Sequence, residues 1–181
     1  VESCEEISSY IRNMNILGAN ITTPFKELII DYLDDISDEV KGIGAVNLIL
    51  NNDGELKGYN TDYLGLTRTI YEAGLSLNGA KCLVLGAGGA ARAAVYGLIE
   101  EQAKVYIANR TTAKAEDMAV YFGFEVFPFD QLNSFSMNFD IVISALLPDV
   151  EIPFKWDGGC KLFIDANYRK SRMGEVAAEK G

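Results

Sequence analysis

The chain of 181 residues contains no histidine, and this absence excludes a large part of enzyme chemistry. Neither a Ser-His-Asp nor a Cys-His mechanism can operate within these residues, and no histidine-bound metal site can form. Any acid–base step must therefore use the side chain of a lysine, aspartate, glutamate, tyrosine or cysteine.

Positive charge is scarce as well. The chain has 16 lysines and arginines against 26 aspartates and glutamates, which gives a net charge of −10. Because binding to a nucleic-acid backbone needs a basic surface, we expect no nucleic-acid partner. No apolar run is long enough to cross a bilayer, since the richest one, residues 141–147, ends at Pro148. We therefore expect no membrane partner.

The three cysteines, Cys4, Cys82 and Cys160, are odd in number and widely spaced. They do not form a disulfide framework, and the pattern indicates a reducing, cytoplasmic setting. The chain begins at Val1 without a methionine and ends after a helix-like segment at Gly181. We expect it to be a segment of a longer protein.

What the sequence does have is the balance of a globular protein, with 49% hydrophobic and 23% charged residues. Its first part, residues 1–77, mixes short helices and strands, and the turn at Asn78-Gly79 predicts a domain boundary. The pattern of residues predicts helices over 8–14, 24–33 and 63–73, and strands over 19–23, 45–50 and 56–60. Asn52-Asp53-Gly54 predicts a hairpin between the last two strands.

The second part, residues 78–181, alternates strands and helices. Apolar strands are predicted over 82–85, 105–108, 125–127, 140–144 and 162–165, with helices over 90–101 and 112–122. Such alternation is typical of a parallel sheet covered on both faces. The chain is therefore predicted to be an α/β protein, with a small α/β domain followed by a Rossmann-like parallel-sheet domain.

A glycine-rich turn, Gly86-Ala87-Gly88-Gly89-Ala90-Ala91, follows the first of these strands and opens the next helix. In a dinucleotide-binding fold, Gly86 permits the tight turn and Gly88 lets the backbone approach a pyrophosphate. Gly89 and Ala90 keep the helix start close to the strand, so that its free N–H groups face the phosphates. A tight turn without a ligand is the alternative, but the repeated strand–helix units favour nucleotide binding.

The strand predicted over 105–108 is followed by Asn109-Arg110-Thr111, where an NAD site usually has an aspartate or glutamate. A carboxylate would repel a 2′-phosphate, whereas a guanidinium can pair with it through two hydrogen bonds. Thr111 adds a hydroxyl, and Lys114 adds a further positive charge. These residues predict NADP(H) in preference to NAD(H), and the alternative is a solvated, basic helix start.

Polar residues also gather at three junctions of the first part, Asn20-Ile21-Thr22-Thr23-Pro24-Phe25-Lys26, Gly44-Ala45-Val46-Asn47 and Asn60-Thr61-Asp62. Taken singly, each has an ordinary structural interpretation. Lys26 is then an exposed helical lysine, Asn47 a turn residue and Asp62 a helix N-cap.

Taken together and in this order, the three junctions, the glycine-rich turn and Asn109-Arg110-Thr111 resemble the shikimate dehydrogenase family, from about Gly18 to Tyr168. The resemblance implies a partial substrate-binding and catalytic domain over residues 1–77, an NADP-binding domain over 78–181, and a cleft between them. It also implies the reversible, NADPH-dependent reduction of 3-dehydroshikimate to shikimate in aromatic amino acid biosynthesis.

Carried over residue by residue, the resemblance assigns Lys26 and Asp62 as a catalytic pair that faces the substrate within reach of the nicotinamide. It assigns substrate binding to Thr22, Lys26, Asn47, Asp62 and Tyr168. It assigns cofactor binding to Gly86, Ala87, Gly88, Gly89, Ala90, Asn109, Arg110, Thr111 and Lys114. We expect no metal, a small-molecule substrate, and a homodimer as the candidate assembly.

A lysine–aspartate pair suits this reaction, because hydride delivery to a ketone develops alkoxide charge that needs a proton donor or cation nearby. The sequence leaves open which of the two residues transfers the proton. Two other functions also stay open: a quinate/shikimate dehydrogenase with broader cofactor use, and a non-catalytic nucleotide-binding module. The presence of both Lys26 and Asp62 argues against the second.

The chain departs from the family pattern in four places. The family's early serine-rich segment, which binds the substrate carboxylate, is absent, because Ser8-Ser9 lie in a helix-like context and do not match it. A C-terminal portion with a glutamine that contacts the substrate is also absent. Ala145-Leu146-Leu147-Pro148 replaces a more polar stretch near the nicotinamide, and Arg169-Lys170-Ser171 replaces a frequent Asn-Pro turn after Tyr168. We therefore expect the segment alone to turn over poorly.

Overall fold

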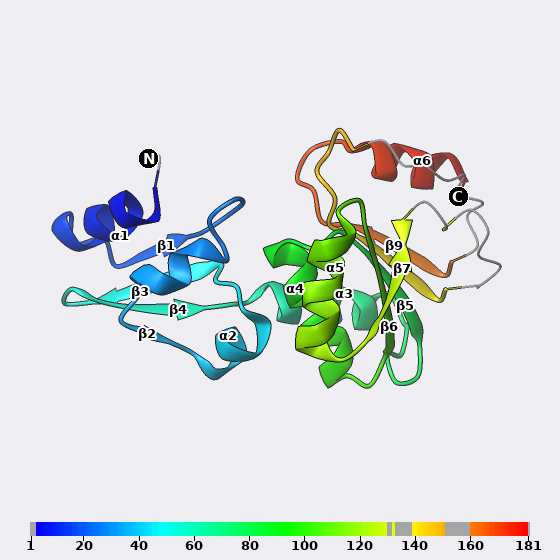
Figure 1. The fold of residues 1–181 in the computed structure, drawn as a ribbon, viewed down its shortest axis with the longest axis horizontal. Helices are drawn as coiled ribbons and strands as arrows, with labels where there is room; N and C mark the ends of the chain where they lie inside the picture. The colour runs from blue at the N-terminus through cyan, green and yellow to red at the C-terminus, as the bar shows by residue number, and fades with distance from the viewer. Residues whose placement is uncertain (1–2, 130–131, 133–138, 151–159, 181) are drawn as a thin grey trace. The chain divides into compact units, whose positions relative to one another are not determined.

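The structure, a computed structural model, describes residues 3–129, 132, 139–150 and 160–180. It separates into two compact units, Val1–Gly65 and Leu66–Gly181, and each is described by itself (Figure 1). Within the described ranges, no helix has the length and apolar character that a membrane span requires.

The first unit contains a four-stranded sheet in the order β1-β3-β4-β2. β1 (Gly18–Asn20), β3 (Leu48–Asn52) and β4 (Glu55–Tyr59) pair antiparallel, and β2 (Asp35–Ile36) pairs parallel with β4. The helices are α1 (Cys4–Asn13), the 3-10 helix η1 (Leu28–Tyr32) and α2 (Asp38–Ile43). Side chains from all three helices pack with the sheet in one core that includes Ile11, Ile29, Val40, Ile49 and Leu56.

The hairpin predicted at Asn52-Asp53-Gly54 is confirmed. Asn52 pairs with Glu55, so the loop has two residues, and both have positive φ angles, 52° at Asp53 and 96° at Gly54. Two-residue loops with positive φ match the twist of the strands they join, which explains why an Asp-Gly pair occupies this position.

The helix predicted over 24–33 is wrong, because the segment forms turns and then the short η1. The Lys26 carbonyl accepts a hydrogen bond from the backbone N–H of Val46 at 2.7 Å, and Phe25 N–H donates back to Thr22 O at 2.9 Å. A tertiary hydrogen bond therefore takes a carbonyl that a continuous helix would need. The structure also adds β2 and α2, which apolar spacing did not predict.

The second unit contains five parallel strands in the order β7-β6-β5-β8-β9, which confirms the Rossmann-like prediction. The strands are β5 (Lys81–Leu85), β6 (Lys104–Asn109), β7 (Glu125–Pro128), β8 (Ile141–Ser144) and β9 (Leu162–Asp165). The helices are α4 (Gly89–Glu100), α5 (Thr112–Phe122) and α6 (Arg172–Lys180), and α3 (Asp62–Glu72) precedes them.

This sheet is buried on both faces. Cys82 and Val84 of β5 belong to one core with residues of α3, α4 and α5, whereas Leu83 and Leu85 belong to a second core with Met173 of α6. Alternate residues of a strand point to opposite faces, so an uninterrupted apolar strand requires cover on both.

The strand order reverses at β5. The chain moves from β5 outward to β6 and β7, and then returns to place β8 on the other side of β5. In open α/β sheets, ligands bind outside the carboxyl ends of the strands at such a reversal. The turn after β5 is therefore the expected ligand position of this unit.

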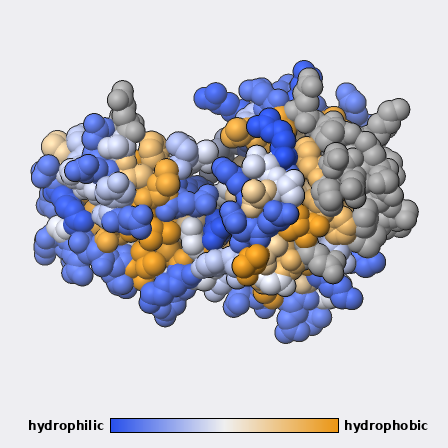
Figure 2. Space-filling view, in the orientation of Figure 1, coloured by the Kyte–Doolittle hydropathy of each residue, from blue (hydrophilic) through white to orange (hydrophobic). Residues whose placement is uncertain are grey.

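Some large apolar side chains stay on the surface, among them Leu17 with 78% and Val120 with 86% of their area exposed. The visible face is otherwise mostly hydrophilic, with hydrophobic residues between the polar ones (Figure 2). Scattered exposed apolar residues of this kind are ordinary on a folded protein and do not by themselves mark a binding site.

Candidate active site

Lys26 and Asp62, which are 36 residues apart in the chain, form an ion pair within the first unit. The distance between Lys26 Nζ and Asp62 Oδ2 is 2.6 Å, and the two side chains are 13% and 30% exposed. The pair is therefore partly shielded from water, where charge interactions are stronger than at a fully exposed surface. Within the described part of the chain, the Lys26 ammonium makes this one hydrogen bond, which leaves two of its donors for a ligand.

Asn47 fixes the other side of the carboxylate. Its Nδ2 donates to Asp62 Oδ1 at 2.7 Å and to Thr61 Oγ1 at 3.0 Å, while its Oδ1 accepts from the backbone N–H of Thr61 at 3.0 Å. Both Asp62 oxygens therefore have a donor, and the orientation of the carboxylate is set by Lys26 and Asn47 together.

Backbone contacts bring the three junctions of the first unit together. Asn47 lies next to Leu48, the first residue of β3, and its carbonyl accepts from Ile21 N–H at 2.8 Å. Val46 N–H donates to Lys26 O at 2.7 Å, and Asn47 N–H donates to Tyr59 O at 3.0 Å. Through Val46 and Asn47, these hydrogen bonds connect Lys26 with Tyr59, which lies shortly before Asp62 in the chain.

Asn60 is a site residue that sequence reasoning missed. Its side chain is buried, donates from Nδ2 to Ala45 O at 2.9 Å, and accepts from the backbone N–H of Asp62 at 2.9 Å. An asparagine whose side chain bonds the backbone two residues on forms an Asx turn. The run Asn60-Thr61-Asp62 at a strand-to-helix junction was the available signal.

The cysteines are not competing acid–base groups. Burial raises the pKa of Cys82 to about 12, and desolvation also raises the pKa of Cys4 and of Cys160. A thiol acts as a nucleophile only as its thiolate. Among the residue types left by the absence of histidine, the Lys26–Asp62 pair is therefore the best candidate for proton transfer.

The glycine-rich turn lies at the strand reversal of the second unit, and its geometry fits a nucleotide. Gly86 has a φ of +112°, and a Cβ there would lie 2.8 Å from the backbone oxygen of Ala145. Gly88 is the N-cap of α4, and a Cβ there would meet no atom within 4 Å. The first N–H groups of an α-helix have no partner inside the helix. The open space beside Gly88 would therefore let a phosphate group approach the N–H donors at the start of α4.

Replacing Gly86 with alanine should destabilise the second unit by about 1–3 kcal/mol, because a side chain at this φ is strained and would collide with Ala145. Gly88→Ala is the matched control, since its φ of −100° suits any residue and the space beside it is open. Denaturant unfolding of the two variants measures the difference. Equal free energies of unfolding would contradict this account of Gly86.

Asn109, Arg110, Thr111 and Lys114 lie at the end of β6 and the start of α5. Asn109 Nδ2 donates to Thr111 O at 2.9 Å, which shapes the turn between the two elements. Arg110, Thr111 and Lys114 are exposed, and in the described ranges their side chains make no hydrogen bond or ion pair. Two cations and a hydroxyl without protein partners are thus available to an anionic group.

The remaining predicted residues lie outside these two clusters. Thr22 is exposed, and within the described part of the chain its hydroxyl makes no hydrogen bond to the Lys26–Asp62 pair. Tyr168 is fully exposed and belongs to the turn between β9 and α6 in the second unit. Their roles stay predictions.

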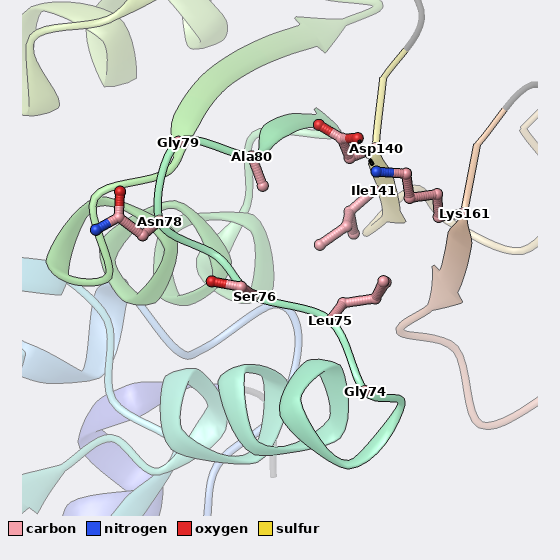
Figure 3. Close-up of a pocket in the computed structure, with 9 residues that line it drawn as sticks. All are labelled: Gly74, Leu75, Ser76, Asn78, Gly79, Ala80, Asp140, Ile141 and Lys161. Atoms are coloured by element: carbon pink, nitrogen blue, oxygen red, sulfur yellow. Dashed lines mark ion pairs between the residues drawn. The ribbon is translucent and has the colours of Figure 1, made fainter.

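A cavity of about 320 Å³ lies at the amino ends of the strands of the second sheet, at the end opposite the glycine-rich turn (Figure 3). Its lining includes the loop before β5 and the ion pair between Asp140 and Lys161, whose Oδ1 and Nζ are 2.8 Å apart. The hydrogen bond from Lys161, with that from Lys81 N–H, holds the pKa of Asp140 below its usual value. Because these residues lie at the amino ends of the strands, the cavity is not the nucleotide position.

Comparison with known proteins gives a consistent picture. Residues 1–49 match the family described as the shikimate dehydrogenase substrate binding domain, and residues 66–152 match the family described as shikimate / quinate 5-dehydrogenase. The shikimate dehydrogenase (NADP(+)) of Caldicellulosiruptor bescii is 36% identical over 195 aligned positions, which cover 99% of this chain and 68% of that protein. The enzyme of the same name from Aquifex aeolicus is 37% identical, over 93% of this chain and 64% of that protein.

Solved structures agree with this result. The crystal structure of shikimate dehydrogenase from Aquifex aeolicus superposes with a TM-score of 0.84 and 32% identity, over 98% of this chain and 68% of that one. The Thermus thermophilus enzyme, solved in complex with NADP(H) and shikimate, superposes with a TM-score of 0.78 and 30% identity, over 98% and 70% of the two chains. The chain thus spans about two thirds of the length of these relatives, and it belongs to the shikimate dehydrogenase family.

Proposed function

We propose that this chain carries the catalytic pair and the nucleotide-binding turn of an NADP-dependent shikimate dehydrogenase, which reversibly reduces 3-dehydroshikimate to shikimate. The observation that carries the proposal is the partly shielded Lys26–Asp62 ion pair, with Asn47 holding the second carboxylate oxygen. The enzyme names of the relatives from Caldicellulosiruptor bescii and Aquifex aeolicus support the same reaction.

In this reaction, bound NADPH supplies the hydride, and the protein must stabilise and protonate the oxygen that was the ketone. The Lys26 ammonium is suited to donate a hydrogen bond to that oxygen as negative charge develops on it. Asp62, whose Oδ2 lies 2.6 Å from the ammonium, orients the lysine side chain. The proton comes from the Lys26–Asp62 pair, and Asn47 keeps the pair in one geometry throughout.

The cofactor residues of the proposal are Gly86, Ala87, Gly88, Gly89 and Ala90 for the pyrophosphate, and Asn109, Arg110, Thr111 and Lys114 for the adenosine 2′-phosphate. These assignments are supported by the positive φ and close packing of Gly86, by the open space at Gly88 and by the exposed cations. Thr22, Asn47 and Tyr168 join Lys26 and Asp62 as the proposed substrate-binding residues.

A second candidate substrate is quinate, because the family that matches residues 66–152 is described by both shikimate and quinate. Comparing kcat/KM for the two substrates would decide between them. A non-catalytic nucleotide-binding module is less well supported, since such a protein has no need of a paired Lys26 and Asp62. The three free cysteines fit a cytoplasmic setting, and the homodimer stays a prediction.

The full-length protein should oxidise shikimate with NADP⁺, and the 181 residues alone should do so on the order of a hundredfold more slowly. Missing contacts to the substrate reduce kcat as well as affinity, because misplacing the reacting groups by about 1 Å can lower the rate that much. The appearance of NADPH, followed by its absorbance, measures both rates.

One outcome would contradict the proposed function, and another would contradict the slow rate expected of the 181 residues. A folded full-length protein that binds NADPH but does not oxidise shikimate or quinate would overturn the catalytic function. A normal rate from the 181 residues would instead show that other residues of the segment replace the absent family motifs.

A further inference from the structure

The segment that carries Tyr168 is held at both of its ends. We define the Tyr168 loop as residues 166–171, between β9 and α6 (Figure 1). Ala166 N–H donates to Ser144 O at 2.8 Å, and Asn167 Nδ2 donates to Leu146 O at 3.0 Å. Just beyond the loop, Arg172 N–H donates to Pro148 O at 2.9 Å. The loop is therefore attached to the segment that follows β8.

One carboxylate joins the two ends of the Tyr168 loop. Asp165 Oδ1 accepts from the backbone N–H of Asn167 at 3.2 Å and from its Nδ2 at 2.7 Å. Asp165 Oδ2 accepts from Ser171 Oγ at 2.5 Å. The Ser171 hydroxyl, which is almost fully buried, accepts in turn from Gly174 N–H at 2.9 Å. Asp165 thus links the end of β9, the start of the loop and the first turn of α6.

The packing around this carboxylate is close. A Cβ at Gly174 would lie 2.7 Å from Asp165 Oδ2 and 3.3 Å from Ser171 Oγ, so any larger residue at this position would displace the carboxylate or the hydroxyl. Within the described ranges, the Asp165 carboxylate accepts three hydrogen bonds, and together they fix the orientation of its side chain.

The tip of the loop contrasts with its ends. Tyr168, Arg169 and Lys170 are all exposed, and the Tyr168 side chain has 101% of its reference area accessible. A side chain that projects from a loop with anchored ends is available to a ligand, and the backbone beneath it is already ordered. Binding to such a residue requires less loss of conformational freedom than binding to an unanchored loop.

We propose that Asp165 is a positioning residue for the dehydrogenase reaction. Its carboxylate holds the Tyr168 loop against the segment after β8, so that Tyr168 meets the substrate in one preset position. The inference rests on the proposed function, because it takes Tyr168 as a substrate contact, and it assigns Asp165 an effect that acts through the loop.

A double-mutant cycle in the full-length protein tests the inference, with Asp165→Asn and Tyr168→Ala made singly and together. Alone, Asp165→Asn should lower kcat/KM for shikimate by about tenfold to a hundredfold, the effect expected when a contact group moves by about 1 Å. In the Tyr168→Ala background it should lower kcat/KM by less than about twofold, because the group that Asp165 positions is gone. The dissociation constant for NADPH should stay within about twofold throughout.

The control is Asp117→Asn, which removes the same charge from an exposed position on α5 and should leave kcat/KM unchanged. Ser171→Ala removes the hydrogen bond from Ser171 Oγ to Asp165 but keeps the hydrogen bonds between Asp165 and Asn167. If Asp165→Asn does not fold, Ser171→Ala takes its place in the double-mutant cycle. Wild-type kcat/KM in Asp165→Asn, or an equal loss with and without Tyr168, would overturn the inference. A wild-type protein that does not oxidise shikimate would overturn the proposed function instead.

Discussion

Replacing Lys26 with alanine in the full-length protein should lower kcat for shikimate oxidation by about 10²–10⁴-fold, the range typical of a positioned acid–base group. The ammonium lies 2.6 Å from Asp62 Oδ2, and the Lys26 side chain is 13% exposed. In the described part of the chain, no other cation pairs with that carboxylate. In the proposed mechanism, the variant lacks the cation beside the developing alkoxide and one member of the proton-transferring pair. Steady-state kinetics of wild type and variant, with unfolding curves of both, provide the measurement.

Lys41→Ala is a suitable control for this experiment. Lys41 also forms an ion pair, with its Nζ 2.7 Å from Asp38 Oδ1, but its side chain is 59% exposed on α2. Exposed ion pairs of this kind contribute little to stability, and Lys41 is not a residue of the proposed site, so this variant should keep its kcat. If Lys26→Ala changed KM alone and left kcat intact, Lys26 would be a binding residue and not part of the proton-transfer pair.

Replacing Arg110 with alanine should weaken NADPH binding by on the order of tenfold to a hundredfold and leave NADH binding nearly unchanged. A charge-assisted hydrogen bond is worth about 1.5–3 kcal/mol, which corresponds to this change in affinity. The net charge of −10 repels the more anionic cofactor, but salt screens that diffuse effect beyond about 8–10 Å. The local contact of Arg110 should therefore dominate cofactor choice.

Titration of wild type and variant with each cofactor would measure the effect, with Arg68→Ala as the control. Arg68 is an exposed arginine whose Nε lies 2.9 Å from Glu72 Oε1 on α3, so its loss removes the same charge without touching the nucleotide turn. Equal losses of NADPH and NADH affinity in Arg110→Ala would mean that Arg110 does not read the 2′-phosphate. Tighter binding of NADH than of NADPH by the wild type would refute the cofactor assignment itself.

The second unit could be predicted well from sequence because its strands are buried on both faces. Residues such as Leu83 and Val84 follow one another without a polar interruption, and each packs into a different core. The helix predicted over 112–122 and the strand predicted over 162–165 have the same bounds in the structure. Local patterns suffice where apolar strands alternate with regular helices, as they do from β5 through α4, β6 and α5 to β7.

The first unit was harder, because tertiary hydrogen bonds decide its short elements. The carbonyl of Lys26 accepts a hydrogen bond from the N–H of Val46 and does not continue a helix. The local sequence around Lys26 does not predict a hydrogen-bond partner that lies 20 residues away. Helix α2 could have been found from its ends, since Ser37 stands at its N-cap and Gly44 ends it with a φ of 72°. Its six residues were too few for apolar spacing to reveal it.

The site was predicted in a different way. Neither spacing nor composition brings Lys26 to Asp62, and the pairing was expected only from the family resemblance of several motifs in order. The structure supplies what that resemblance did not, namely that Asn47 and Asn60 orient Asp62 from two sides. Amide groups with this role are hard to recognise from sequence, because an asparagine in a turn has an ordinary local explanation.

The exposed side chains of Arg110, Thr111 and Lys114 have a consequence for how such an enzyme changes over evolutionary time. Within the described ranges they make no hydrogen bond or ion pair, whereas Gly86 is fixed by its backbone angle and by Ala145. Substitutions at exposed, unpartnered positions usually alter stability by less than about 0.5 kcal/mol. If the proposed assignments hold, a lineage could therefore change its cofactor preference at the end of β6 at little cost in folding stability, whereas Gly86, in the turn proposed to bind the pyrophosphate, would tolerate few substitutions.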